Sequence, residues 1–443
     1  MNERQMDLDP ESFLMSLVHL ARSLSKRRLW TLASIAYALA LRLHGPKIDS
    51  VAWRELNVVL GASGLNRLGK RLLWRSTNTS LDVKMEAIKL KALRGKSREA
   101  LAHFQDFSDK QFPAELGKQV GEGFRKVVQE SDVDGRELEA LVDRYTSDRR
   151  VVLVAGLDFS GSSAVFDFFR EFENAVPVET EIPHLSRGRY CLYEVSRHLN
   201  DRAEFRRHSL EFFCRYVLGF SRITEVMDFR IHKFARRRAL SRGAGQYAES
   251  VKTCGALISA INAETSASKR RRIFDALVNQ VLTEIVVETP LQDSDILVFR
   301  NAIKAVNLSQ AASLGSFTVI ACFRDPRDSY VAQTREKFHH GIPVKSWIDR
   351  ALRNHVLADA ALRDQEKNSR TRIARVQFED FVRSVSTRRT VADFSGLSES
   401  VWNPEVHFVP TKSQRNIGMF RDFGEPSAIS AIEDRMRNFL HNQ

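Results

Sequence analysis

Residues Val151–Arg170 read VVLVAGLDFSGSSAVFDFFR, and this stretch decides the fold. The apolar run Val151–Ala155 is typical of a strand buried in a parallel sheet. Glycine and serine follow the run, and Val165, Phe168 and Phe169 then recur at the spacing of a helix. The stretch therefore predicts a strand, a loop of small residues and a helix. This order is typical of an α/β fold in which helices flank a parallel sheet.

The loop between strand and helix has the composition of a phosphate-binding site. N–H groups in the first turn of a helix lack partners and lie at the positive end of the helix dipole. Small residues let an anion approach those groups, and the candidate contacts are Ser160, Gly161, Ser162 and Ser163. The alternative is an ordinary strand-to-helix turn without a ligand.

The spacing of the two glycines is that of a nucleotide-binding P-loop. Gly156 and Gly161 form GxxxxG, but Ser162 stands where that motif has lysine. A kinase or ATPase needs this lysine on its β- and γ-phosphates. The loop therefore predicts phosphate binding without ordinary NTPase chemistry.

A second strand and turn lie at Phe317–Gln333, which reads FTVIACFRDPRDSYVAQ. Thr318–Phe323 predicts a buried strand, Arg-Asp-Pro-Arg-Asp follows it, and Tyr330 begins a predicted helix. Together with the Gly/Ser loop, this R-D-P-R-D-x-Y-V motif resembles the sulfotransferases that use 3′-phosphoadenosine 5′-phosphosulfate (PAPS). The resemblance implies that the serine loop holds the 5′-phosphosulfate. It also implies that Arg324 holds the 3′-phosphate, which distinguishes PAPS from ATP.

Two further stretches fit this family, so the resemblance covers about residues 149–443. Ile373–Val382, IARVQFEDFV, resembles a late strand and the turn after it. Thr411–Phe423, TKSQRNIGMFRDF, resembles the basic C-terminal loop that closes over the nucleotide. The resemblance makes Lys412 and Arg415 candidate contacts for the cofactor.

Two positions depart from the pattern of the family. Phe159 stands where the family has a lysine or arginine that neutralises the bridging oxygen as the bond to sulfur breaks. Ala332 stands where the family has a serine on the 3′-phosphate. Residues that can compensate for this serine are Ser329, Tyr330 and Arg327.

Candidates for catalytic residues lie in two stretches, one after the first helix and one after a later strand. By the resemblance, Val176–Leu185 leads toward the acceptor cleft, and its general base is Glu181, Glu179 or His184, with Glu181 preferred. Ile296–Phe299 predicts a strand, and ligands of open α/β sheets bind beyond the carboxyl ends of strands. Arg300 and Lys304 are therefore candidates to replace the missing cation, with Arg187 and Arg189 in reserve. The alternatives are surface charges for the first set and helix caps for the second.

The rest of the chain predicts mainly helices. Residues 1–107 show a coarse pattern of apolar and small residues that resembles tetratricopeptide repeats, with an unrelated helical bundle as the alternative. Such a domain is a candidate surface for a protein partner. Residues 108–148 predict a helical linker, and 149–443 form the predicted sulfotransferase domain. Within that domain, His198–Asn279 predicts a helical insert that covers the sheet.

Composition limits the partners and the compartment. The chain has 443 residues and a net charge of +13, which suits an anionic partner, but it shows no signature of a nucleic-acid-binding motif. Its four cysteines have no paired spacing, which fits reduced thiols, and no motif requires a metal. We find no signal peptide and no stretch long enough to span a bilayer. We therefore expect a cytoplasmic protein, or one that binds peripherally to the membrane.

These observations predict an α/β protein of the P-loop type preceded by an all-α domain. The expected reaction moves a sulfuryl group from PAPS to a hydroxyl of a carbohydrate or glycolipid. Two alternatives remain open at this point. The first is a P-loop nucleotide kinase or NTPase, and the second is a non-catalytic nucleotide-binding scaffold.

Overall fold

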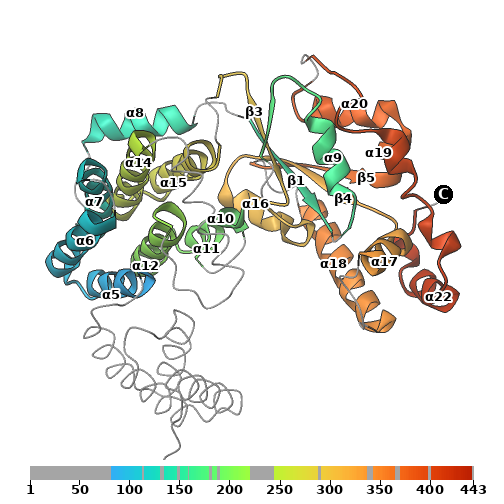
Figure 1. Cartoon of the computed structure of the whole chain (residues 1–443), viewed down its shortest axis with the longest axis horizontal. Coiled ribbons are helices and arrows are strands. Elements are labelled where there is room, and N and C mark those ends of the chain that lie inside the picture. The colour runs from blue at the N-terminus through green and yellow to red at the C-terminus, as the bar shows by residue number, and fades with distance from the viewer. Residues whose placement is uncertain are drawn as a thin grey trace, which may run out of the picture. The chain divides into compact units, whose positions relative to one another are not determined.

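The structure of the protein is a computed structural model (Figure 1). It describes residues 81–111, 114–129, 134–146, 150–157, 159–178, 182–186, 190–219, 244–287, 291–336, 343–364, 370–397 and 401–441. The chain divides into two compact units, Met1–Ser131 with Leu210–Gly255, and Asp132–Ser209 with Ala256–Gln443. Most of the predicted repeat domain lies outside the described residues, and the predicted limits at 107 and 148 stay predictions.

Close helix packing characterises the described part of the first unit. Its helices are α5 (Leu81–Leu93), α6 (Ser97–Gln111), α7 (Ala114–Gln129), the π-helix η2 (Phe213–Val217) and parts of α12 (Arg202–Phe212) and α14 (Ala244–Ala263). Phe104 of α6 stacks on Phe124 of α7 at 4.0 Å between ring centroids. A Cβ on Gly123 of α7 would lie 2.8 Å from Val251 of α14, so glycine permits this approach. Residues 210–255 belong to this unit, and the prediction that His198–Asn279 covers the sheet stays a prediction.

The second unit contains a five-stranded sheet. Its strands are β1 (Val151–Gly156), β2 (Ala175–Val178), β3 (Ile296–Arg300), β4 (Thr318–Phe323) and β5 (Arg372–Gln377). All neighbours are parallel, in the order β2-β3-β1-β4-β5. The chain builds the sheet on one side of β1 first and then crosses to the other side. The carboxyl end of β1 is therefore the topological switch point, where open α/β sheets bind ligands.

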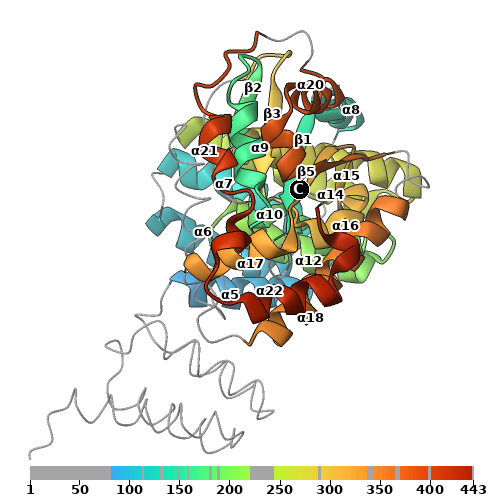
Figure 2. The same ribbon diagram turned by 90° about the vertical axis from the view of Figure 1, so that its right-hand side faces the viewer.

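Helices flank this sheet, which confirms the predicted α/β class (Figures 1 and 2). The helices of this unit are α8 (Gly135–Thr146), α9 (Ser162–Phe169), α10 (Pro183–Ser186), α11 (Leu192–Ser196), α15 (Ala267–Gln280), α16 (Leu308–Leu314), α17 (Pro326–Arg335), α18 (Val344–Asp364), α19 (Phe378–Arg383), α20 (Val385–Phe394), α21 (Pro410–Gln414), α22 (Pro426–Arg435), the π-helix η3 (Val281–Ile285) and the 3₁₀-helices η4 (Ala305–Asn307), η6 (Met419–Asp422) and η7 (Arg437–Phe439). Helix α17 begins at Pro326 and not at the predicted Tyr330. The reason is that Asp325 caps it and proline fits its first turn.

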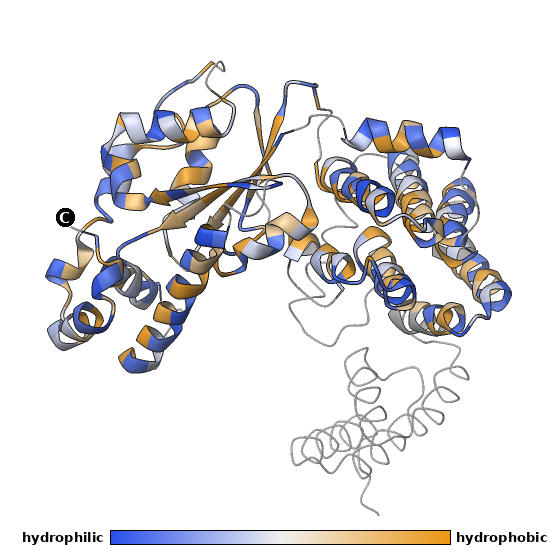
Figure 3. Ribbon diagram, turned by 180° about the vertical axis from the view of Figure 1, so that it is seen from behind, coloured by the Kyte–Doolittle hydropathy of each residue, from blue (hydrophilic) through white to orange (hydrophobic). Residues whose placement is uncertain are grey.

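Alternate side chains of the strands point to opposite faces of the sheet. Val152 and Val154 of β1 pack into a core to which α9 and α19 contribute several phenylalanines. Phe168 of α9 is central to it and meets Phe381 of α19 edge-on at 5.3 Å. On β4, Phe323 lies against His355 of α18. Figure 3 shows the inner strands mainly in the hydrophobic colour, as expected of strands covered by helices.

Candidate functional site

The loop after β1 is wound tightly around two residues with left-handed backbone conformations. Phe159 has a φ of 57°, and Gly161, directly before α9, has a φ of 81°. Glycine is required at the second position, since a Cβ there would collide with the ring of Phe378. The N–H of Ser160 donates to the carbonyl of Leu157 at 3.0 Å. The predicted strand, loop and helix are therefore confirmed, and the loop opens into the first turn of α9.

The three serines of the loop differ in their partners. Ser160 is 1% exposed, and its Oγ has no hydrogen-bond partner. Ser162 Oγ donates to Asn301 Oδ1 at 3.4 Å, and Ser163 Oγ accepts a bond of 3.4 Å from Arg300 Nη1. An unpaired buried hydroxyl is uncommon in native proteins and calls for an explanation such as a ligand. Because its hydroxyl is buried and unpaired, Ser160 is the serine of this loop that indicates a binding site.

Arg324 joins the turn after β4 to this loop. Its Nη1 donates to the carbonyl of Phe159 at 3.3 Å, and its Nη2 donates to the carbonyl of Asn416. Its Nε is buried without a partner, and its guanidinium lies 5.1 Å from the ring centroid of Phe378. Burial lowers the pKa of Arg324, but arginine stays charged in proteins. A buried cation with an unused donor is suited to binding an anion.

The other charges of the Arg-Asp-Pro-Arg-Asp motif hold the C-terminal segment. Asp325 accepts two bonds from Arg327, of 3.0 and 2.7 Å, and one of 3.1 Å from the N–H of His441. Asp328 accepts from the N–H groups of Gly418 and Phe420 at 2.7 and 3.2 Å. These bonds fix the turn after β4 against residues about ninety positions later in the chain.

Arg327 belongs to this network of bonds between the turn after β4 and the C-terminal segment. It also donates to Glu433 Oε1 at 2.7 Å, and its guanidinium lies over the ring of Phe420. The bonds to Asp325 and Glu433 raise the pKa of Arg327 against the opposing effect of burial. These contacts occupy Arg327, and the prediction that Ser329, Tyr330 or Arg327 compensates for the serine missing at Ala332 stays a prediction.

A pocket that is open to solvent lies beside Arg324. Ser160, Arg324 and Ser329 line it together with one face of α17 and α18. The lining residues from those helices are Pro326, Gln333, Trp347, Arg350, Ala351, Asn354 and His355. The α18 members recur at steps of three and one, so the spacing in the sequence is the signal that could have identified them.

On the α18 side, the pocket wall combines neutral side chains with one cation, Arg350. Trp347 Nε1 donates to Gln333 Oε1 at 3.0 Å. Burial lowers the pKa of His355 to about 4, so this imidazole is neutral at pH 7. The positive charge that faces an anion in this pocket therefore comes from Arg324 and Arg350.

The remaining predicted site residues are placed as follows. Arg300 lies beside the start of α9, whereas Lys304 is exposed ahead of η4. Lys412 and Arg415 are exposed at α21, and the carbonyl of Asn416 makes the contact with Arg324. Outside the described residues are Glu179, Glu181, Arg187 and Arg189, and His184 is described only as part of the backbone of α10.

Comparison with family models, with curated proteins and with solved structures finds no match to this chain. None of the helices described in the structure is long and apolar enough to cross a membrane. The likeness to sulfotransferases thus rests on the motifs and on the site to which they contribute.

Proposed function

We propose that this protein is a PAPS-dependent sulfotransferase that acts on a hydroxyl group of a carbohydrate or glycolipid. The supporting observation is one pocket that is lined by both a loop serine and the arginine of the second motif. Ser160 and Arg324 line this pocket, and Ser160 Oγ and Arg324 Nε are buried without a hydrogen-bond partner. Two unused donors beside a helix N-terminus, at the switch point of the sheet, favour an anionic nucleotide.

The residues fit the two phosphate-bearing ends of PAPS. In this proposal the loop residues Ser160, Gly161, Ser162 and Ser163 bind the 5′-phosphosulfate, with N–H groups of α9 as further donors. Arg324 and Ser329 bind the 3′-phosphate, and Lys412 and Arg415 approach the nucleotide from the C-terminal segment. The uncharged aromatic and amide side chains of α17 and α18 suit the remainder of a nucleotide.

The chemistry supplied by the donor is transfer of a sulfuryl group. The acceptor oxygen forms a bond to sulfur while the bond from sulfur to the bridging phosphate oxygen breaks, and 3′,5′-adenosine bisphosphate leaves. A base takes the acceptor proton, and Glu181, Glu179 and His184 are the candidates. Arg300, which lies beside the loop, is the candidate that balances charge on the leaving phosphate.

The alternatives make different predictions about nucleotides. A kinase or NTPase needs a lysine in this loop, and the chain has Ser162 at that position. A non-catalytic scaffold is favoured by Phe159, which brings no charge to the place where the family has a cation. The scaffold binds the nucleotide but does not turn it over.

Calorimetric titration of the full chain with 3′,5′-adenosine bisphosphate, 5′-AMP and ATP tests the proposal. The bisphosphate should bind about ten- to a hundredfold more tightly than 5′-AMP, because a charge-assisted contact contributes about 1.5–3 kcal/mol. Arg324→Ala should remove this preference, whereas Arg389→Ala, on an exposed part of α20, should keep it. Binding should persist in EDTA.

Equal affinities for the bisphosphate and 5′-AMP in the wild-type protein would overturn the assignment of Arg324. Tight binding of ATP that requires Mg²⁺ would favour the NTPase alternative. If the bisphosphate binds as expected but no acceptor becomes sulfated, the scaffold alternative is favoured.

A further inference from the structure

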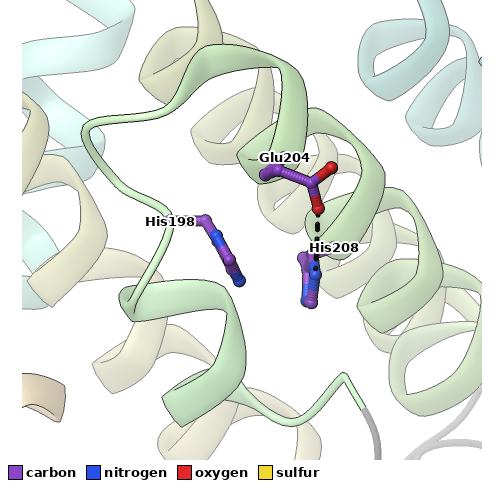
Figure 4. Close-up of side chains that lie close together, drawn as sticks. All are labelled: His198, Glu204 and His208. Carbon is purple, nitrogen blue, oxygen red and sulfur yellow. Dashed lines mark ion pairs between the residues drawn. The ribbon is translucent and has the colours of Figure 1, made fainter.

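Two histidines and one glutamate meet at the start of α12, in a cluster that the proposed function does not use. One ligand atom from each of His198, Glu204 and His208 lies within 4.8 Å of the other two. Glu204 and His208 are one turn apart on α12 and therefore share a face of the helix. His198 comes from the turn ahead of the helix. Figure 4 shows the two rings side by side and Glu204 reaching toward His208.

The backbone that carries these side chains is well fixed. Asp201 Oδ1 accepts from the N–H groups of Ala203 and Glu204, each at 3.1 Å, and so caps α12. Arg270 of α15 donates to the carbonyl of Leu199 at 2.6 Å. The turn with His198 is therefore held on both sides before any ligand arrives, as a preorganised site requires.

His208 is in a state that suits a metal ligand. It is 7% exposed, and its Nδ1 has no hydrogen-bond partner. Its Nε2 lies 3.5 Å from Glu204 Oε2 and 3.5 Å from Arg207 Nη2. The role of Nε2 in these two contacts depends on the tautomer of the ring, and the tautomer with its proton on Nδ1 leaves a lone pair on Nε2 for a metal ion.

A cation already occupies part of this arrangement. The guanidinium of Arg207 also lies 3.3 Å from Glu204 Oε2, so it approaches two of the three ligand residues. Its side chain is 47% exposed, and a long exposed side chain can move into solvent. The cluster therefore attracts positive charge, and its present cation is displaceable.

We propose that His198, Glu204 and His208 bind one Zn²⁺ ion. Two imidazoles and one carboxylate form a ligand set that zinc proteins use, and it leaves a fourth position for water or a substrate. Zinc bonds of about 2.0–2.2 Å bring tetrahedral ligand atoms to about 3.3–3.5 Å from one another. The rings of His198 and His208 lie with their centroids 4.2 Å apart and their planes at 32°, so the half-buried His198 and Glu204 have to rotate when the ion binds. The proposal does not rest on the sulfotransferase assignment.

Zinc titration of the full chain tests this site. The protein is first stripped with a chelator, and Zn²⁺ is then added in competition with a chromophoric chelator. We expect about one equivalent of Zn²⁺ per chain, and His208→Ala should weaken binding by at least about a hundredfold. Arg207→Gln should strengthen binding by about tenfold, because it removes a competing positive charge.

Two control variants locate the metal. His407→Ala removes an exposed histidine, and His339→Ala with His340→Ala removes the adjacent histidine pair of the sequence. Both should leave the zinc affinity unchanged. Loss of binding in either control, or no zinc binding in the wild-type protein, overturns the proposal.

Should His208→Ala fail to fold, visible absorption of Co²⁺ in the wild-type protein and in Arg207→Gln provides the second measurement. A site with two nitrogen ligands gives d–d bands of four- or five-coordinate Co²⁺ in both proteins. The six-coordinate spectrum of hydrated Co²⁺ in both proteins would overturn the proposal.

Discussion

The turns after β1 and β4 follow neighbouring strands at the carboxyl edge of the sheet, yet most polar groups of the second turn are paired with the C-terminal segment, whereas a buried serine of the first is unpaired. In the turn after β4, Asp325 and Asp328 each accept bonds from the C-terminal segment, and Arg327 is held between two carboxylates. In the loop after β1, Ser160 is buried with an unpaired hydroxyl. Arg324 connects the two turns, since it belongs to the turn after β4 and donates to the carbonyl of Phe159 in the loop after β1.

This difference separates the residues that build the site from those that face a ligand. Charge alone would assign ligand binding to the whole Arg-Asp-Pro-Arg-Asp motif. Most of its charges instead satisfy one another and fix the end of the chain. Open binding capacity remains in a neutral serine and in one nitrogen of Arg324. We therefore expect mutations of Asp325, Arg327 and Asp328 to reduce stability. Mutations that remove the unpaired atoms, Ser160 Oγ and Arg324 Nε, should reduce ligand affinity.

The largest effect should come from Asp325→Ala. This change leaves Arg327 and the N–H of His441 without their buried partner and removes the cap of α17. Breaking a buried ion pair typically lowers the free energy of unfolding by about 3–5 kcal/mol. Urea denaturation measures the change. Asp380→Ala is the control, since that carboxylate is exposed and its Oδ1 lies 3.0 Å from His441 Nε2. Equal effects of the two variants would contradict the stabilising role assigned to Asp325.

Arg300→Ala should have the next largest effect, on turnover and not on folding. The loop after β1 has Phe159 where a cation is expected, and Arg300 lies at the start of α9 through its bond to Ser163. Removal of one preorganised donor raises a barrier by about 2.7–4 kcal/mol, or about a hundred- to a thousandfold in rate. Sulfuryl transfer from PAPS measures it, and exposed Lys304→Ala is the matched control. A larger loss in the control would assign the role to Lys304.

The strands β1, β3 and β4 were predictable because they are short apolar runs, whereas β2 was not predicted and β5, which reads RIARVQ, was indicated by the family resemblance. β4 spans Thr318–Phe323 as predicted, and β3 and β5 lie where Ile296–Phe299 and Ile373–Val382 indicate. These patterns are local and depend on burial alone. The contribution of 210–255 to the first unit was not predictable, because helical periodicity does not say which neighbour a helix packs against.

The site was predictable only in part for the same reason. The carbonyl of Asn416 reaches Arg324 across 92 positions of the sequence, and backbone groups carry no residue-specific signal. The engagement of Arg327 was also hidden, since its sequence neighbours include Asp325 but not Glu433. In contrast, the face of α18 in the pocket follows a spacing that can be read from the sequence.

Gly161→Ala should have a smaller effect than the two changes above and should lower both stability and affinity. A residue with a side chain at a φ of 81° is destabilised by about 1–2 kcal/mol, and its Cβ would also press on Phe378. Gly135→Ala is the control, because a Cβ there meets open space. Urea denaturation and titration with 3′,5′-adenosine bisphosphate measure the two effects. If Gly161→Ala behaves like Gly135→Ala, the loop does not need this backbone conformation.

Ser160→Ala should have the smallest effect, and its sign should differ between the two measurements. Without a nucleotide, the change removes a buried hydroxyl that has no partner, so the free energy of unfolding should stay the same or rise. With 3′,5′-adenosine bisphosphate, the variant lacks one hydrogen bond to the phosphate, and affinity should fall by about 0.5–1.5 kcal/mol, or about two- to tenfold. Ser162→Ala is the matched control inside the same loop, because Ser162 Oγ already donates to Asn301 Oδ1. That control should lower the free energy of unfolding, which Ser160→Ala should not do. A Ser160→Ala protein that is less stable but binds the nucleotide normally would show that the hydroxyl stabilises the fold. The loop after β1 would then not differ from the turn after β4 in having a group available for a ligand.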